Sequence, residues 1–152
     1  SAGALTFRIT VPGAATHASR RLSGVSAIEK FIPIFSALRR LEKERNAIKH
    51  TLATRWELPI PIEIGKITAG DWASSVPDRL KAEGRMGVAI SEDVATARHA
   101  LEETVSNACQ DDSWLRDHPA TVEWWGGQFA SGVTDAAFLL IVKLALVPVA
   151  KL

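Results

Sequence analysis

The chain of 152 residues carries 18 Lys and Arg against 17 Asp and Glu, a formal net charge of +1, and 47% of its residues are hydrophobic. The length suits one globular domain, and the balanced charge argues against binding to nucleic acid or to an anionic membrane, which needs clustered, uncompensated Lys and Arg. A lone cysteine, Cys109, excludes an internal disulfide framework and a thiolate zinc site, so we expect a reducing, cytoplasmic setting.

The first predicted elements are a strand and a long helix. Apolar and polar residues alternate from Leu5 to Val11, which is the period of a half-buried strand. A polar loop over residues 14–24 follows. Ser26 and Glu29 then have capping-box spacing, and an amphipathic helix is predicted from there to about Ala47, kinked or divided at Pro33. Its predicted core stripe is Ile28, Phe31, Ile32, Phe35, Leu38 and Leu41.

The middle of the chain predicts two more strands. Alternation from Ile60 to Thr68 indicates the second strand, and two prolines near its start favour an edge position. Residues 69–77 are predicted to be a loop. The third strand follows from Leu80 to Val88, with Gly84 as a candidate bulge.

A second helix and a last strand complete the pattern. Ser91 is the predicted N-cap of the helix, because acidic residues follow it at the positive helix end. Its apolar stripe consists of Val94, Ala97, Leu101 and Val105. The last strand is predicted from Thr121 to Trp125 and is closed by Gly126 and Gly127.

This order of elements predicts an α+β, ferredoxin-like βαββαβ fold, a four-stranded antiparallel sheet with two helices on one face. The other face is then polar, lined by Arg8, Thr10, Glu83 and Arg85. Residues 131–152 form an apolar tail, predicted to be helical. It is shorter than the about 20 apolar residues of a membrane span and is interrupted by Lys143, so a buried helix is the favoured interpretation.

Local motifs for chemistry are scarce. The histidines are His17, His50, His99 and His118, and no two have the spacing of a metal-binding pair on a helix or strand. No nucleophile elbow, phosphate-binding glycine loop or dinucleotide fingerprint is present. We therefore expect no catalytic metal site in this chain.

Two segments resemble a known family. Val11–Ser19, followed by Gly24–Glu29, resembles the opening of the lid or dimerisation domain in the acetylornithine deacetylase and succinyl-diaminopimelate desuccinylase family of zinc metallohydrolases. Carboxypeptidase G and aminoacylase belong to the same superfamily. Ala69–Pro77, with Glu83-Gly84-Arg85 downstream, is similar to that family's Gly-Gly, Asn-Val-Ile-Pro and Arg pattern.

The resemblance covers residues 4–130, which we expect to be the lid domain. Residues 131–152 would then be either the start of a catalytic-domain helix or residues added to the domain. Ala69 replaces one family glycine, and Ser74 stands where the family commonly has Asn, which puts the acyl-group specificity in doubt. Because the chain begins at Ser1 without an initiator Met, we expect it to be part of a longer protein.

The resemblance implies roles for individual residues. His17 matches the histidine that reaches the partner subunit's active site and donates to the oxygen that becomes negative in the tetrahedral intermediate. Arg85 matches the arginine that holds the substrate carboxylate. Ser74 and Ser75 are candidate substrate contacts. The two zinc ions of the family, or cobalt in their place, would belong to a catalytic domain outside this chain, so the chain alone is expected to be inactive.

Each of these residues also has a plain interpretation. His17 can be a solvated loop histidine, Arg85 a surface arginine paired with a neighbour, and Ser74 and Ser75 ordinary loop residues. The leading hypothesis is the lid and dimerisation domain of a zinc-dependent amidohydrolase or peptidase acting on N-acyl amino acids or small peptides. A homodimer would form through the edge of the second strand and the first helix. The alternative is a stand-alone ferredoxin-like module that binds a small ligand or has a regulatory role.

Overall fold

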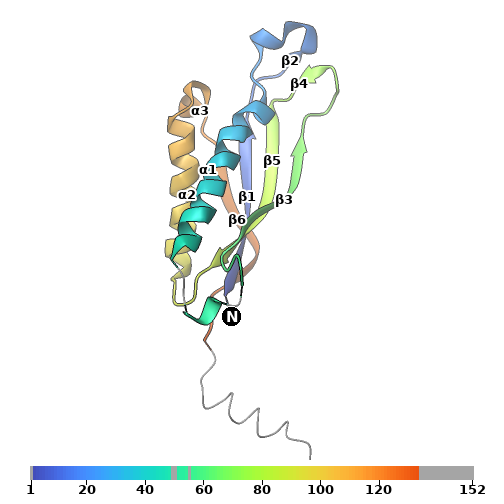
Figure 1. The fold of residues 1–152 in the computed structure, drawn as a ribbon. Helices are drawn as coiled ribbons and strands as arrows, with labels where there is room; N and C mark the ends of the chain where they lie inside the picture. The colour runs from blue at the N-terminus through green and yellow to red at the C-terminus, as the bar shows by residue number, and fades with distance from the viewer. Residues whose placement is uncertain (1, 49–50, 55, 134–152) are drawn as a thin grey trace, which may run out of the picture.

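The computed structural model describes residues 2–48, 51–54 and 56–133 and confirms the predicted α+β, ferredoxin-like fold. Four antiparallel strands form a sheet in the order β3-β5-β1-β6, and the long helices α1 and α2 cover one face of it (Figure 1). The strands and helices, in chain order, are β1 (Gly3–Pro12), β2 (Thr16–His17), η1 (Ala18–Ser23), α1 (Ala27–Ala47), η2 (Thr51–Ala53), β3 (Ile62–Ala69), β4 (Ser75–Val76), β5 (Arg79–Val88), α2 (Val94–Gln110), α3 (Ser113–Asp117) and β6 (Thr121–Phe129).

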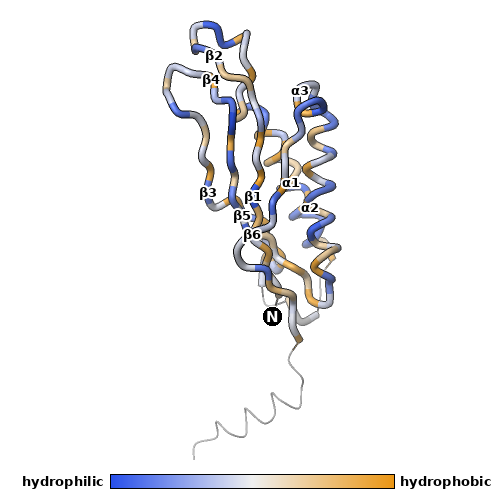
Figure 2. The backbone as a smooth tube through the Cα atoms, turned by 180° about the vertical axis from the view of Figure 1, so that it is seen from behind, coloured by the Kyte–Doolittle hydropathy of each residue, from blue (hydrophilic) through white to orange (hydrophobic). Residues whose placement is uncertain are grey.

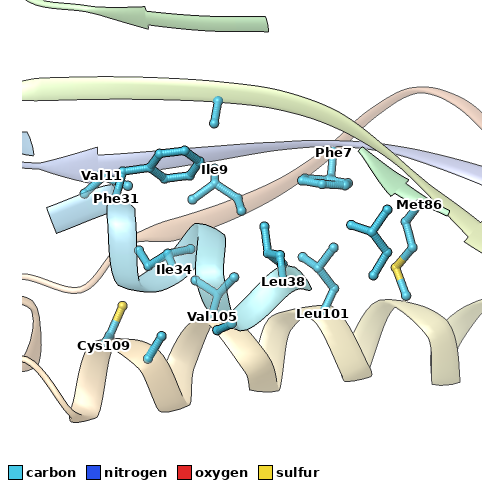
Figure 3. Packing of buried hydrophobic residues seen from close by; sticks show 14 of the residues in the cluster. Phe7, Ile9, Val11, Phe31, Ile34, Leu38, Met86, Leu101, Val105 and Cys109 are labelled. Atoms are coloured by element: carbon cyan, nitrogen blue, oxygen red, sulfur yellow. The ribbon is translucent and has the colours of Figure 1, made fainter. Parts of the chain in front are cut away.

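The core lies between the sheet and the two long helices. Phe7 and Ile9 on β1 are fully buried and point toward Leu38 of α1 and Leu101 of α2 (Figure 3). The alternation that predicted β1 therefore has its apolar side against the helices. Each such side chain, when fully buried, contributes about 1.5–3 kcal/mol. None of the helices in the described part of the chain is long and apolar enough to cross a membrane.

Helix α1 differs from the prediction in which residues it buries. Its core side consists of Ala27, Phe31, Ile34, Ala37 and Leu38. Ile28, Ile32 and Phe35, predicted to face the core, are exposed. The helix also continues through Pro33 as one element, so the predicted division into two pieces is wrong. Pro33 lies on the exposed side, where water can satisfy the carbonyl that loses its partner.

Strand β3 is at the edge of the sheet, as predicted from its prolines, and begins at Ile62, just after the second of them. The prediction of a bulge at Gly84 of β5 is wrong, because the bulge lies in the neighbouring strand β3. The register between β3 and β5 shifts from Ile64 to Lys66, which leaves Gly65 as the extra residue. Gly84 has a different role, because a Cβ there would lie 2.5 Å from the Glu63 carbonyl oxygen and 2.7 Å from the ring of Phe7.

In the C-terminal half, two further predictions are corrected and one element is new. The N-cap of α2 is Asp93, whose Oδ2 accepts from the N–H of Ala95, whereas Ser91 lies in a turn with φ 69°. The short helix α3 was not predicted. Strand β6 continues beyond the glycine pair to Phe129, because Gly126 has φ 63° and the register with β1 shifts there. The predicted tail from residue 134 onward lies outside the described residues.

Candidate functional site

His17 lies at the tip of the domain, beyond the end of the sheet, on a segment that was predicted to be a loop. The structure corrects that prediction, because Thr16 and His17 form β2, which pairs with β4 so that His17 faces Ser75 (Figure 1). The N–H of Ala18 also donates to the carbonyl of Ser74 at 2.8 Å. The structure thus brings together three of the predicted site residues, His17, Ser74 and Ser75.

The hydrogen bonds of His17 determine its tautomer. The backbone N–H of Ser19 donates to Nδ1 of His17 at 3.2 Å, and the Ser19 hydroxyl lies 2.9 Å from the same nitrogen. Since a backbone N–H can only donate, Nδ1 is the acceptor, and the neutral ring carries its proton on Nε2. The ring is exposed, so Nε2–H is a donor available to a group outside the domain.

The tip is held by backbone contacts with the segment before β5 and with Val25, which lies just before α1. Gly13 donates its N–H to the carbonyl of Asp78 at 2.7 Å, and Ala14 exchanges two hydrogen bonds with Val25. A Cβ at Gly13 would lie 2.3 Å from the carbonyl oxygen of Val25, so only glycine permits this approach. Both loops at the tip show hydrophilic stretches (Figure 2).

Arg85 is not brought close to His17 within one chain. In the register of β5, Arg85 is paired with Thr6 and Glu63, whereas Arg79 is paired with Pro12 at the end nearest the tip. Six residues of strand, at about 3.3 Å each, separate Arg85 from Arg79 by about 20 Å. Arg85 instead borders a largely apolar hollow of about 610 Å³ at the opposite end, beside Gly3.

The open sheet face between these two ends is occupied by an ionic network. Arg8 donates to Oε1 of Glu83 from Nε at 3.0 Å and from Nη2 at 2.8 Å, and it reaches Glu123 at 3.4 Å. The hydrogen bond from Arg8 holds the pKa of Glu83 below its usual value. Arg8 also lies over the ring of Trp125, 4.9 Å from its centroid. The centre of this face is therefore internally neutralised.

Sequence patterns missed several residues that the fold places near the tip. Arg79 lies on the open face of β5, but the predicted strand began one residue later, at Leu80. Trp72 and Leu22, in the two tip loops, are 71% and 93% exposed. The alternation of Lys81, Glu83 and Arg85 could have identified Arg79 as a further residue of the open face. No sequence pattern distinguished Trp72 or Leu22 from other loop residues.

An exposed apolar surface runs along α1 and the sheet edge. It consists of Ile28, Ile32 and Phe35 of α1 and Ile67 of β3, and we refer to it as the β3–α1 surface. Arg39 connects its two elements, because it lies over the Phe35 ring and reaches Glu63 of β3 at 3.6 Å. As an edge strand, β3 has a row of backbone groups without partners in the sheet.

A metal centre is not visible in the described residues. No three His, Cys, Asp or Glu side chains among them lie close enough together to hold a metal ion. The histidine of the tip has serines as its neighbours, which are poor zinc ligands. The described residues therefore do not fit the zinc ions implied by the resemblance.

Comparison with known proteins gives a family and a fold. Residues 1–113 match the model of the peptidase dimerisation domain. An amidase of the hydantoinase/carbamoylase family from Burkholderia vietnamiensis has a TM-score of 0.67 at 16% identity, covering 95% of this chain and 32% of that one. An aminobenzoyl-glutamate utilization protein from Klebsiella pneumoniae has a TM-score of 0.56 at 17% identity, covering 97% of this chain and 34% of that one.

An aminopeptidase from Bacillus cereus is similar over 95% of this chain and 35% of its own, with a TM-score of 0.57 and 15% identity. At these identities the structural likeness shows the fold alone. The chain spans about a third of the length of these structures. A search of curated proteins gave no significant match.

Proposed function

Because the chain belongs to the peptidase dimerisation domain family, we propose that it is the dimerisation and lid domain of a metal-dependent amidohydrolase or peptidase. The proposed substrates are N-acyl amino acids, as in the acetylornithine deacetylases, or small peptides. The domain would span residues 4–130, a range that contains nearly all of the sheet. Residues 131–152 would lie outside it.

The observation that carries this proposal is the available Nε2–H of His17. When a carbonyl carbon is attacked, its oxygen becomes negative, and a fixed N–H donor stabilises that charge. The hydrogen bond from the Ser19 N–H to Nδ1 keeps the proton of the neutral ring on Nε2. In the proposed enzyme the tip of one subunit would present this donor to the active site of the other.

The other predicted site residues are proposed to contact the substrate. Ser74 and Ser75 lie beside His17, and their hydroxyls could hydrogen-bond a polar group near the reacting carbonyl. Arg85 is exposed and makes no ion pair with the described residues, so its guanidinium is free for a carboxylate. Its distance from the tip means that Arg85 would meet a different part of the site from His17.

The zinc or cobalt ions of the proposed enzyme would be held by residues outside this chain. When bound, such ions supply a water of lowered pKa as the nucleophile. The role proposed for His17 is separate, because a donor to the carbonyl oxygen acts on the substrate and not on the metal.

The β3–α1 surface is the proposed homodimer interface. Two copies related by a two-fold axis could pair their β3 edges into one continuous sheet and cover Ile28, Ile32 and Phe35 of α1. This arrangement would also cover Ile67 of β3, which is 52% exposed in one chain.

Replacing His17 by alanine in the full-length enzyme tests the catalytic part of the proposal. Loss of one donor to a developing oxyanion lowers turnover by about 10²- to 10³-fold, and we expect the metal content and the dimer to remain unchanged. His118→Ala is the matched control, because His118 is also exposed but its ring stacks on Trp114 and does not belong to the His17, Ser74 and Ser75 group. Near-normal turnover of the His17 variant would refute the role.

A further inference from the structure

A smaller hollow, lined by polar and apolar groups, lies on the open sheet face at the end nearest the tip. Its volume is about 420 Å³, and its lining consists of Thr10, Pro12, Gly13, Asp78, Arg79, Pro119 and Thr121. Among the described residues, nothing forms a side-chain hydrogen bond or ion pair with Arg79, Thr10 or Thr121. The hollow therefore collects one guanidinium and two hydroxyls whose side chains have no hydrogen-bond or ion-pair partner within the described ranges.

The sheet register explains why these groups converge. Thr10 of β1 is paired with Thr121 of β6 on one side and with Lys81 of β5 on the other. Arg79 is paired with Pro12, two residues further along β1. All of these side chains lie on the face away from the helices, because Ile9 and Val11 between them are fully buried.

The charges along β5 make this end of the face positive. In the middle of the face, Glu83 is within 2.8 Å of Arg8 and 3.4 Å of Lys66, so its charge is compensated. Arg79 and Lys81 have no such partner among the described residues. Asp78 is the one acidic residue in the lining of the hollow, so Arg79 and Lys81 together leave an excess of one positive charge at this end, which suits a ligand with one negative charge.

We propose that this hollow is a binding site for the carboxylate of an amino-acid-sized molecule. A planar guanidinium pairs with a carboxylate through two parallel hydrogen bonds, and neighbouring hydroxyls can donate to the remaining lone pairs. Arg79 supplies the charge, and Thr10 and Thr121 supply the hydroxyls. The site goes beyond the proposed function, because it requires neither a partner subunit nor a catalytic domain.

Titration of the isotope-labelled full chain by NMR tests the site, with N-acetylglycine as the probe. At low ionic strength we expect saturable shifts of the amide signals of Thr10, Gly13 and Thr121. The uncharged N-acetylglycinamide, which differs only at the carboxylate, should leave these signals unchanged. Equal shifts with both probes, or tighter binding of inorganic phosphate than of N-acetylglycine, would overturn the assignment to a carboxylate.

Matched variants then identify the residue responsible. Arg79→Gln should weaken N-acetylglycine binding at least about tenfold, which corresponds to about 1.4 kcal/mol. Arg40→Gln removes the same charge from the exposed side of α1 and should leave the affinity unchanged. Undiminished affinity of the Arg79 variant would refute the site but would not affect the role of His17, which is measured by turnover. Preserved amide spectra show that both variants are folded.

Discussion

Replacing Ile32 by serine tests whether the β3–α1 surface holds two copies of the chain together. Ile32 lies at the centre of the exposed stripe of α1, four residues after Ile28 and three before Phe35. Its side chain does not belong to the core, so the substitution removes apolar surface with little effect on the fold of one chain. The expected result is a weaker dimer and a smaller loss in the stability of the single chain, because only part of the Ile32 side chain is covered within one chain.

The magnitude follows from the exposure of the side chain. Fully burying an isoleucine contributes about 1.5–3 kcal/mol, and Ile32 is still 59% exposed in one chain. Covering that remainder in a dimer contributes about 0.9–1.8 kcal/mol per chain. A two-fold dimer contains the contact twice, so the variant loses about 1.8–3.5 kcal/mol. The dissociation constant should rise about 20- to 300-fold.

Sedimentation equilibrium over a range of concentrations measures the constant directly. Ile48→Ser is the control, since Ile48 is 83% exposed at the far end of α1, away from the β3–α1 surface. A chain ending at Gly132 shows whether residues 133–152 contribute to association. Equal dissociation constants for the parent chain and the Ile32 variant would refute this interface, as would a dimer that is lost when those residues are removed.

Two further predictions concern stability, measured by urea unfolding. Gly84→Ala should destabilise the fold by about 1–3 kcal/mol, because the added methyl group meets the Glu63 carbonyl and the Phe7 ring. Gly65→Ala is the control and should be neutral or slightly stabilising, because no atom lies within 4 Å of the added methyl group. Similar losses of stability in the two variants would contradict the packing argument. Asp112→Ala should cost about 0.5–2 kcal/mol at pH 7, because Asp112 caps α3. Burial raises the pKa of Asp112. Hydrogen bonds from Lys30 and from the α3 backbone lower the pKa by more than burial raises it, so the net pKa is below the usual 3.8. Its stabilisation is therefore present above about pH 4 and lost as the pH falls through the folded pKa, so the cost should shrink toward pH 2; a cost independent of pH would contradict this.

The strands and the order of elements could be predicted from the sequence because they depend on local periodicity. The alternation around Phe7 and Ile9 puts all apolar side chains of that strand on one face of the sheet. The prolines before Ile62 leave β3 only an edge position. Helix α1 could not be resolved in this way. Its apolar residues cover more than half of its circumference, and the positions of the sheet and of α2 decided that Phe31 faces the core and Ile32 faces outward.

The candidate site depends still more on contacts between distant segments. The sequence indicated His17 only through a family resemblance. The tautomer of His17 follows from the hydrogen bond with Ser19, and its position follows from the pairing with Ser75. Arg79 and Thr121 are 42 residues apart in the chain, and only the sheet register brings them to one hollow. Residue type and periodicity thus decided which segments are strands and helices. The convergence of polar groups was decided by strand pairing, because hydrogen-bond register joins residues that no local pattern connects.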